Sequence, residues 1–216
     1  MFTTRALPGK GIPAITLSDG PNGVRKQAGA ADHLGLNPSV PATCFPTSAT
    51  VANSWDRSLA RLWAQPWAKK QRHRACRLLL GPGLNIKRSP LCGRNFEYFS
   101  EDPYLAGKMA AAYVRGIQKN GIAACPKHFA VNSQELRRMA SDSIVDERTL
   151  REIYLTGFEM VVKEAQPKTI MSAITLSTAP TPTRTPTCSW ISCAGTGALT
   201  AQWSPTGAAA TTTPSA

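Results

Sequence analysis

Four ionisable side chains, each placed shortly after a short apolar run, could hold a polyhydroxylated ligand. They are Asp19, Arg94, Lys127 and His128. Together they supply a carboxylate, a guanidinium, an ammonium and an imidazole, which form charge-assisted hydrogen bonds with hydroxyl groups. A lone Asp or Arg is more often a surface ion pair, whereas an adjacent Lys-His pair after a buried strand favours a binding site.

The elements that must position these side chains are short apolar runs that alternate with amphipathic helices. The runs lie at residues 15–17, 78–80, 122–125 and 169–171, and they suit parallel strands buried on both faces. Helices are predicted after Asp102 and Asp146, because both residues can cap a helix N-terminus. The alternation predicts an α/β fold, either a barrel or an open sheet. In both, residues past the carboxyl ends of the strands build the active site.

Several classes of protein are disfavoured by composition. The six cysteines include no CxxC pair and the three histidines lie far apart, so we expect no metal, no cofactor and no disulfide framework. The chain has no run of roughly 18 apolar residues, so we expect no membrane span. It shows no signal peptide, so we expect a cytoplasmic protein with reduced thiols.

The formal net charge of +12 first suggests a nucleic-acid-binding protein. The positive charge is concentrated in residues 61–77. This segment holds six Lys or Arg residues and no Asp or Glu. This segment also contains Trp63, Trp67 and Pro66, and Pro66 is predicted to break any continuous helix.

Four segments of the chain resemble glycoside hydrolase family 3, the family of many β-glucosidases. They are ITLSDGPNGVR at 15–25, LLLGPGLNIKRSPLCGRNFEYFSEDP at 78–103, CPKHFAVNSQELRR at 125–138 and SIVDERTLREIYLTGFE at 143–159. The resemblance covers residues 8–60 and 78–173. It implies an N-terminal (β/α)8 barrel of the TIM type, followed in the family by a second α/β domain.

The resemblance also implies roles for individual residues. The positions that would hold the hydroxyls of a non-reducing glucose are Asp19, Arg94, Lys127, His128 and Arg138, with Arg25 a weaker candidate. The substrate would be a β-glucoside or an oligosaccharide. The family is retaining: an Asp attacks the anomeric carbon, and a Glu about 5 Å away transfers the proton.

The segment that carries the Asp nucleophile in the family does not occur in this chain. The match ends after residue 173, and the tail at 174–216 is rich in Thr, Ala, Ser and Pro. If the third base of each codon is joined to the first two bases of the next, residues 202–207 can be read as VVSDW. The nucleophile codon would then straddle Pro205 and Thr206. We hypothesise that 174–216 is an out-of-frame tail.

The same operation turns the basic run into an acidic, alanine-rich helix, so residues 61–77 are also interpreted as out of frame. The chain is therefore predicted to be a partial barrel domain at 1–173, about the first five βα units, with a disordered tail. Its parent activity would be hydrolysis of terminal non-reducing β-D-glucosyl residues. This chain is expected to be inactive and also to lack a helix at its N-terminus.

Two other functions stay open. A non-catalytic sugar-binding or regulatory protein could keep the binding residues and lose catalysis. A basic nucleic-acid-binding protein rests on the charge run alone and ranks third, so no nucleic-acid partner is expected. Oligomeric state, linkage preference and the choice between glucosides and xylosides are not predicted.

Overall fold

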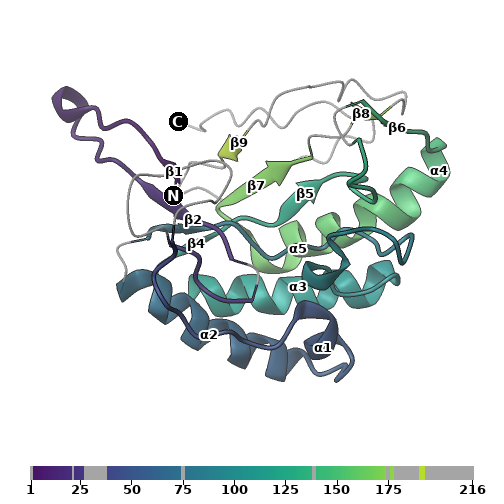
Figure 1. Cartoon of the computed structure of the whole chain (residues 1–216), viewed down its shortest axis with the longest axis horizontal. Coiled ribbons are helices and arrows are strands. Elements are labelled where there is room, and N and C mark those ends of the chain that lie inside the picture. Colours follow the sequence, from purple (N-terminus) through teal and green to yellow (C-terminus); the bar gives the residue numbers. More distant parts are fainter. Residues whose placement is uncertain are drawn as a thin grey trace.

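The computed structural model describes residues 2–20, 22–26, 38–73, 76–137, 140–173, 176–177 and 190–192. It has an α/β fold in which parallel strands form one layer and the helices α2, α3 and α5 lie together on one side of them (Figure 1). The predicted α/β class with parallel strands is therefore confirmed.

The first sheet contains β1 to β4 in that order. The strands are β1 (Phe2–Thr3), β2 (Thr16–Ser18), β3 (Leu78–Leu79) and β4 (Ala123–Ala124). β1 pairs antiparallel with β2, whereas β2 with β3 and β3 with β4 pair in parallel. The side chains of β3 are buried on both faces, as the continuous apolar run predicted.

The parallel pairing continues into β5 (Lys127–Phe129) and β7 (Thr169–Ser172). The amide of Lys127 donates to the carbonyl of Pro82 at 3.0 Å, and the amide of Leu84 donates to the carbonyl of Lys127 at 2.9 Å. These bonds join β5 to the residues that follow β3. The parallel strands therefore neighbour one another in sequence order, and their carboxyl ends meet at one edge.

The predicted helix starts are confirmed. α3 (Pro103–Gln118) begins after Asp102, whose carboxylate accepts from the amides of Tyr104 and Leu105, and proline occupies the first turn. Asp146 accepts from the amide of Thr149 at 2.9 Å and caps α4 (Glu147–Thr149). The π-helical segment η3 (Leu150–Leu155) then leads into α5 (Thr156–Ala165).

The largest core cluster lies among α2, α3 and α5, where small residues allow the helices to approach closely. A Cβ atom added to Gly116 of α3 would lie 2.5 Å from the carbonyl oxygen of Arg61 and 2.7 Å from Cβ of Ala64. The backbones of α2 and α3 are thus in direct contact at this point. This packing holds the helices together beside the strands whose carboxyl ends lead into the loops of the site.

The expectation that Pro66 breaks the helix is wrong. α1 (Ser48–Ala52) is followed by α2, which runs without a break over Arg57–His73 with Pro66 inside it. Pro66 lies on the exposed side, while the opposite face is buried. Trp67 is only 2% exposed and its ring meets the ring of Tyr113 edge-on at 6.3 Å. Burial of this face outweighs the roughly 3 kcal/mol penalty of an internal proline.

The tail was predicted to lack structure, and its described residues correct this in part. β8 (Leu176–Ser177) pairs in parallel with β6 (Asp142–Ser143), and β9 (Trp190–Ser192) pairs antiparallel with β7. The physical reason is that an edge strand leaves unpaired N–H and C=O groups, which any extended segment can satisfy. The rest of 174–216 lies outside the described residues.

Candidate functional site

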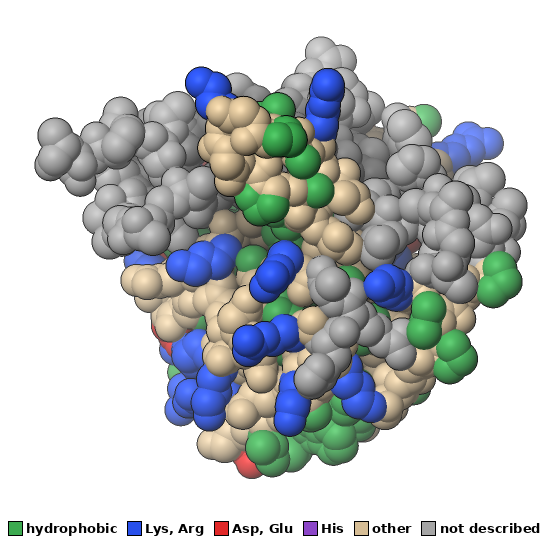
Figure 2. Space-filling view, turned by 90° about the vertical axis from the view of Figure 1, so that its left-hand side faces the viewer, with side chains coloured by type: hydrophobic (Ala, Val, Ile, Leu, Met, Phe, Trp, Pro, Cys, Tyr) green, Lys and Arg blue, Asp and Glu red, His purple; other side chains and the backbone are tan. Residues whose placement is uncertain are grey.

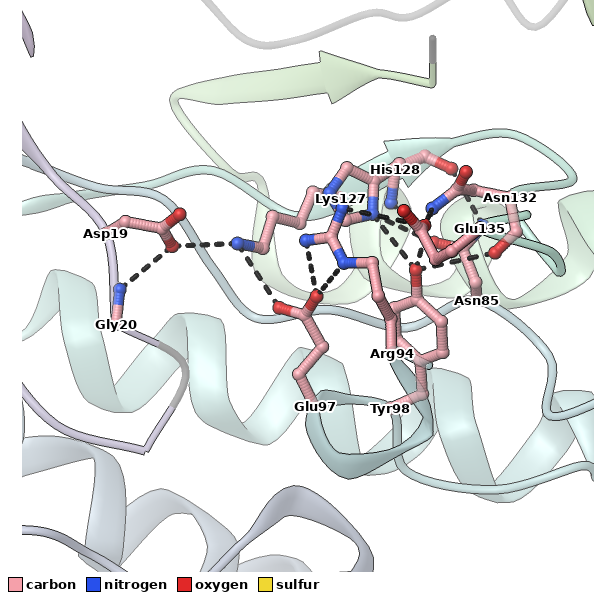
Figure 3. A network of polar contacts seen from close by, with 10 residues as sticks. All are labelled: Asp19, Gly20, Asn85, Arg94, Glu97, Tyr98, Lys127, His128, Asn132 and Glu135. Carbon is pink, nitrogen blue, oxygen red and sulfur yellow. Dashed lines mark hydrogen bonds and ion pairs between the residues drawn. The ribbon is translucent and has the colours of Figure 1, made fainter. Parts of the chain in front are cut away.

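Side chains from separate strands and loops converge at the carboxyl ends of the parallel strands (Figure 3). Asp19 directly follows β2, and Lys127 and His128 belong to β5. Arg94 caps the short 3-10 helix η2 (Asn95–Glu97), which lies in the loop between β3 and α3. The structure therefore brings together four of the residues that the sequence predicted for the site.

Lys127 lies at the centre of the charged half of this network. Its Nζ atom contacts Asp19 Oδ1 at 2.8 Å and Glu97 Oε2 at 3.3 Å (Figure 3). The Lys127 and Glu97 side chains are 1% and 2% exposed, whereas that of Asp19 is 44% exposed. The ammonium and the Glu97 carboxylate thus form a buried pair, with Asp19 at its accessible end.

Glu97 also joins Lys127 to Arg94. Both Nε and Nη2 of Arg94 bond to Oε1 of Glu97, while Nη1 lies 3.9 Å from Oε1 of Glu135. One buried carboxylate therefore holds two cations that come from different segments of the chain. Such pairing is what permits charged groups to be buried at all.

The other half of the network holds His128. Its ring nitrogen Nδ1 lies 3.2 Å from the hydroxyl of Tyr98 and 3.3 Å from Oδ1 of Asn85. The Asn85 amide also donates to the carbonyl of His128 and accepts from its N–H, at 2.8 and 2.7 Å. Asn132 donates to Tyr98 at 2.9 Å and to Glu135 at 3.1 Å. The orientation of the imidazole is thereby fixed from two sides.

The electrostatics keep these groups in defined protonation states. Burial alone would raise the pKa of Asp19, but the charge and hydrogen bond of Lys127 outweigh it, and the pKa falls below its usual 3.8. Burial would lower the pKa of Arg94, but the Glu97 carboxylate raises it instead. Burial raises the pKa of Tyr98 well above 10.0. At neutral pH the site therefore offers a carboxylate, a guanidinium and a neutral phenol.

Two other predicted site residues have different outcomes. The amide of Arg25 donates to the carbonyl of Asp19 at 3.0 Å, but the Arg25 side chain is exposed, so Arg25 supports Asp19 through its backbone. Arg138 lies outside the described residues. Its assignment to the site stays a prediction.

The sequence reasoning missed the residues that hold the site together: Asn85, Glu97, Tyr98, Asn132 and Glu135. All lie within the segments 78–103 and 125–138 that carry the family resemblance. The available signal for these five residues was that they lie in the motifs that resemble the family. Their role in holding the site depends on their burial and on their partners, which residue type does not predict.

No group of three or more metal-ligating side chains is found in the part of the chain that the structure describes. Within the same residues, no helix is long and apolar enough to cross a membrane. Among the described residues, Cys44, Cys76, Cys92 and Cys125 are not joined in disulfides.

A parallel α/β layer that gathers charged side chains at the carboxyl ends of its strands is common to barrels and open sheets, which bind ligands at that edge. Residues 24–195 match the family described as "Glycosyl hydrolase family 3 N terminal domain". The chain belongs to glycoside hydrolase family 3, and several of its relatives are named as β-glucosidases. The matched range includes residues 61–77 and runs past residue 173. The boundaries predicted for the partial barrel at 1–173 and the tail at 174–216 stay predictions.

Known proteins of this family are similar over most of the chain. Thermostable beta-glucosidase B of Acetivibrio thermocellus is 54% identical over 170 residues, which are 79% of this chain and 22% of that protein. An exo-alpha-(1->6)-L-arabinopyranosidase of Bifidobacterium longum is 47% identical over 168 residues, 77% of this chain and 22% of that protein. The chain thus spans about a fifth of the length of these relatives.

A solved structure of beta-glucosidase 3B from Thermotoga neapolitana in complex with glucose superposes with a TM-score of 0.75 at 43% identity. The superposition covers 82% of this chain and 24% of that one. At this identity the shared fold reflects a shared family, which agrees with the sequence match.

Proposed function

We propose that this chain is the first part of the (β/α)8 barrel of a retaining β-glucosidase, about the first five βα units. In this proposal it carries the half-site that holds the hydroxyls of a terminal β-D-glucosyl residue. The supporting observation is the network in which Asp19, Lys127, Glu97 and Arg94 converge at the strand ends. Relatives named as β-glucosidases, and a neighbour that binds glucose, support the choice of sugar.

The geometry suits hydroxyl binding. Within the described residues, the Asp19 carboxylate accepts two hydrogen bonds, both on Oδ1, from the Gly20 amide and from Lys127, each at 2.8 Å. In this proposal Oδ2 accepts a sugar hydroxyl. The Lys127 ammonium has three donors; it donates one to Asp19 and forms an ion pair with Glu97, so a further donor can serve the ligand. The Asp19 carboxylate, an acceptor, and the Lys127 ammonium, a donor, thus lie side by side and suit two neighbouring sugar hydroxyls.

The proposal includes loss of hydrolysis in this chain. A retaining mechanism needs a carboxylate free to attack and a second group to move the proton. Glu97 is buried between Lys127 and Arg94, and Asp19 is held by Lys127. Neither is placed as a nucleophile or an acid. The family nucleophile would be encoded across Pro205 and Thr206 in the shifted frame, so neither catalytic carboxylate is assigned.

A non-catalytic sugar-binding protein is the second candidate. The observation that favours it is that Asp19, Arg94, Lys127 and His128 are all held by hydrogen bonds or ion pairs even though no catalytic pair is assigned. Both candidates predict glucose binding, and they differ in whether a restored reading frame would produce turnover.

The test is titration of glucose into the full chain by calorimetry or ligand-observed NMR, alongside an aryl β-glucoside assay. We expect weak glucose binding and no turnover. Asp19→Asn should weaken binding, whereas Asp142→Asn, an exposed carboxylate outside the network, should not. Turnover by the unaltered chain would refute the loss of catalysis, and equal binding by Asp19→Asn would refute the half-site.

A further inference from the structure

The acidic side chains of the described residues lie mainly at one end of the strand layer, whereas Lys and Arg occur at both ends. The acidic side chains gather at the carboxyl end, in the network, in the cap of α3 and along 142–152. The amino end, where α2, α3 and α5 finish, carries mostly Lys and Arg. Figure 2 views this end, and its acidic side chains show only toward the margins.

Five exposed cations form what we call the amino-end cluster: Lys69, Arg72, Arg77, Lys119 and Lys168. The first two lie in the last two turns of α2, and Arg77 directly precedes β3. Lys119 caps the end of α3. The amide of Lys168, which precedes β7, donates to Oε1 of Gln118 in α3 at 3.0 Å. The topology therefore brings all five to one face.

Carboxylates are scarce at this face. Among the described residues, Glu164 lies in the last turn of α5, and it already pairs with Lys108 and Arg115. No ion pair is found for the five cluster side chains within the described part of the chain. Their positive potential is therefore not neutralised locally.

We propose that the amino-end cluster binds the phosphate backbone of nucleic acid without sequence preference. Lys and Arg that neutralise phosphates release counterions, and this supplies most of non-specific binding. The sequence alone predicted no such partner because the basic run was interpreted as a misread helix. In the structure the part of that run up to His73 belongs to α2, and Lys69 and Arg72 are exposed on it. The cluster lies at the opposite end from the sugar site, so this proposal does not depend on the proposed function.

A polynucleotide fits the cluster better than a membrane surface. Interfacial binding needs apolar side chains that enter the lipid beside the cations. The large exposed hydrophobic residues of the described chain include Leu7, Ile12 and Ile15 in the segment before β2, where the amide of Arg77 donates to the carbonyl of Thr16. They include none between residues 63 and 90 or between 105 and 135. The helix ends themselves thus carry charge without large apolar side chains, and binding to phosphatidylserine vesicles tests whether the segment before β2 adds an anchor.

The test is fluorescence anisotropy of the full chain with two labelled 20-base-pair duplexes of unrelated sequence, over a series of salt concentrations. If about four phosphates are neutralised, log K should fall with log salt at a slope of about −3.6. Lys69→Gln/Arg72→Gln/Arg77→Gln should make the slope shallower by about 2.7. The matched control, Arg57→Gln/Arg88→Gln/Arg148→Gln, removes the same charge from exposed sites at the carboxyl end.

Circular dichroism should show that both triple variants keep the helices, since all six side chains are exposed. Equal affinity for the two duplexes and a loss confined to the cluster variant would support the proposal. It would be overturned if both triple variants weaken binding alike, because net charge alone would then explain it. It would also be overturned if the cluster variant loses binding to phosphatidylserine vesicles but not to DNA.

Discussion

The buried carboxylate Glu97 should be the most sensitive charged position in the site. Glu97→Gln keeps the size of the side chain and removes its charge, so Lys127 and Arg94 lose the anion between them. Glu97 and Lys127 are 2% and 1% exposed, with Oε2 and Nζ 3.3 Å apart. Water therefore cannot replace the lost charge as it would at the surface.

The expected loss follows from this burial. Removing one partner of a buried ion pair destabilises a protein by about 3 to 5 kcal/mol. Lys127 keeps Asp19 at 2.8 Å, and Arg94 keeps Glu135 at 3.9 Å and is 21% exposed. These remaining partners place the estimate at the lower end, about 3 kcal/mol. The assay is urea unfolding of both chains at pH 7, followed by circular dichroism.

Two further variants make the test specific. Glu152→Gln removes an exposed partner of Arg148, whose side chain is 83% exposed, and should change the free energy of unfolding by less than about 1 kcal/mol. Lys127→Met added to Glu97→Gln should recover part of the loss, because it removes a buried ammonium while its other partner, Asp19, is 44% exposed and can be hydrated. If Glu97→Gln costs no more than Glu152→Gln, the two cations do not depend on Glu97 and the argument is refuted.

Three other outcomes are expected. Tyr98→Phe should lower the free energy of unfolding by about 1 to 3 kcal/mol, measured in urea, because it leaves the partners of a buried hydroxyl unsatisfied; no change would show that those partners do not need it. The folded protein lowers the pKa of Asp19 below 3.8, so the contribution of Asp19 to stability is complete above pH 3.8 and is lost as the pH falls through its folded-state pKa. Asp19→Asn should therefore remove the fall of the unfolding midpoint at acid pH, measured over a pH series. Pro66→Ala should raise the free energy of unfolding by about 1 to 3 kcal/mol because Pro66 is exposed within α2; a decrease would mean that the proline ring itself packs.

Local chemistry made much of the fold predictable from the sequence. Asp102 followed by proline is a helix start in most contexts, and the apolar run at 78–80 is a buried strand whatever surrounds it. Asp19, Arg94, Lys127 and His128 were found because parallel strands place the residues after their carboxyl ends together. Each of these inferences needs only neighbouring residues or a general rule of topology.

Tertiary packing decided the rest. Asp19 and Lys127 meet although 108 residues separate them, and Glu97 acquires its role because both its cations are brought to it. α2 continues through Pro66 because one face of that helix is buried against α3. The partners in each case come from distant segments, and burial changes the energy of a charge or a helix break by several kcal/mol. The sequence was therefore sufficient to predict which residues form the site. Only the tertiary structure determined which of their charges are buried and with which partners.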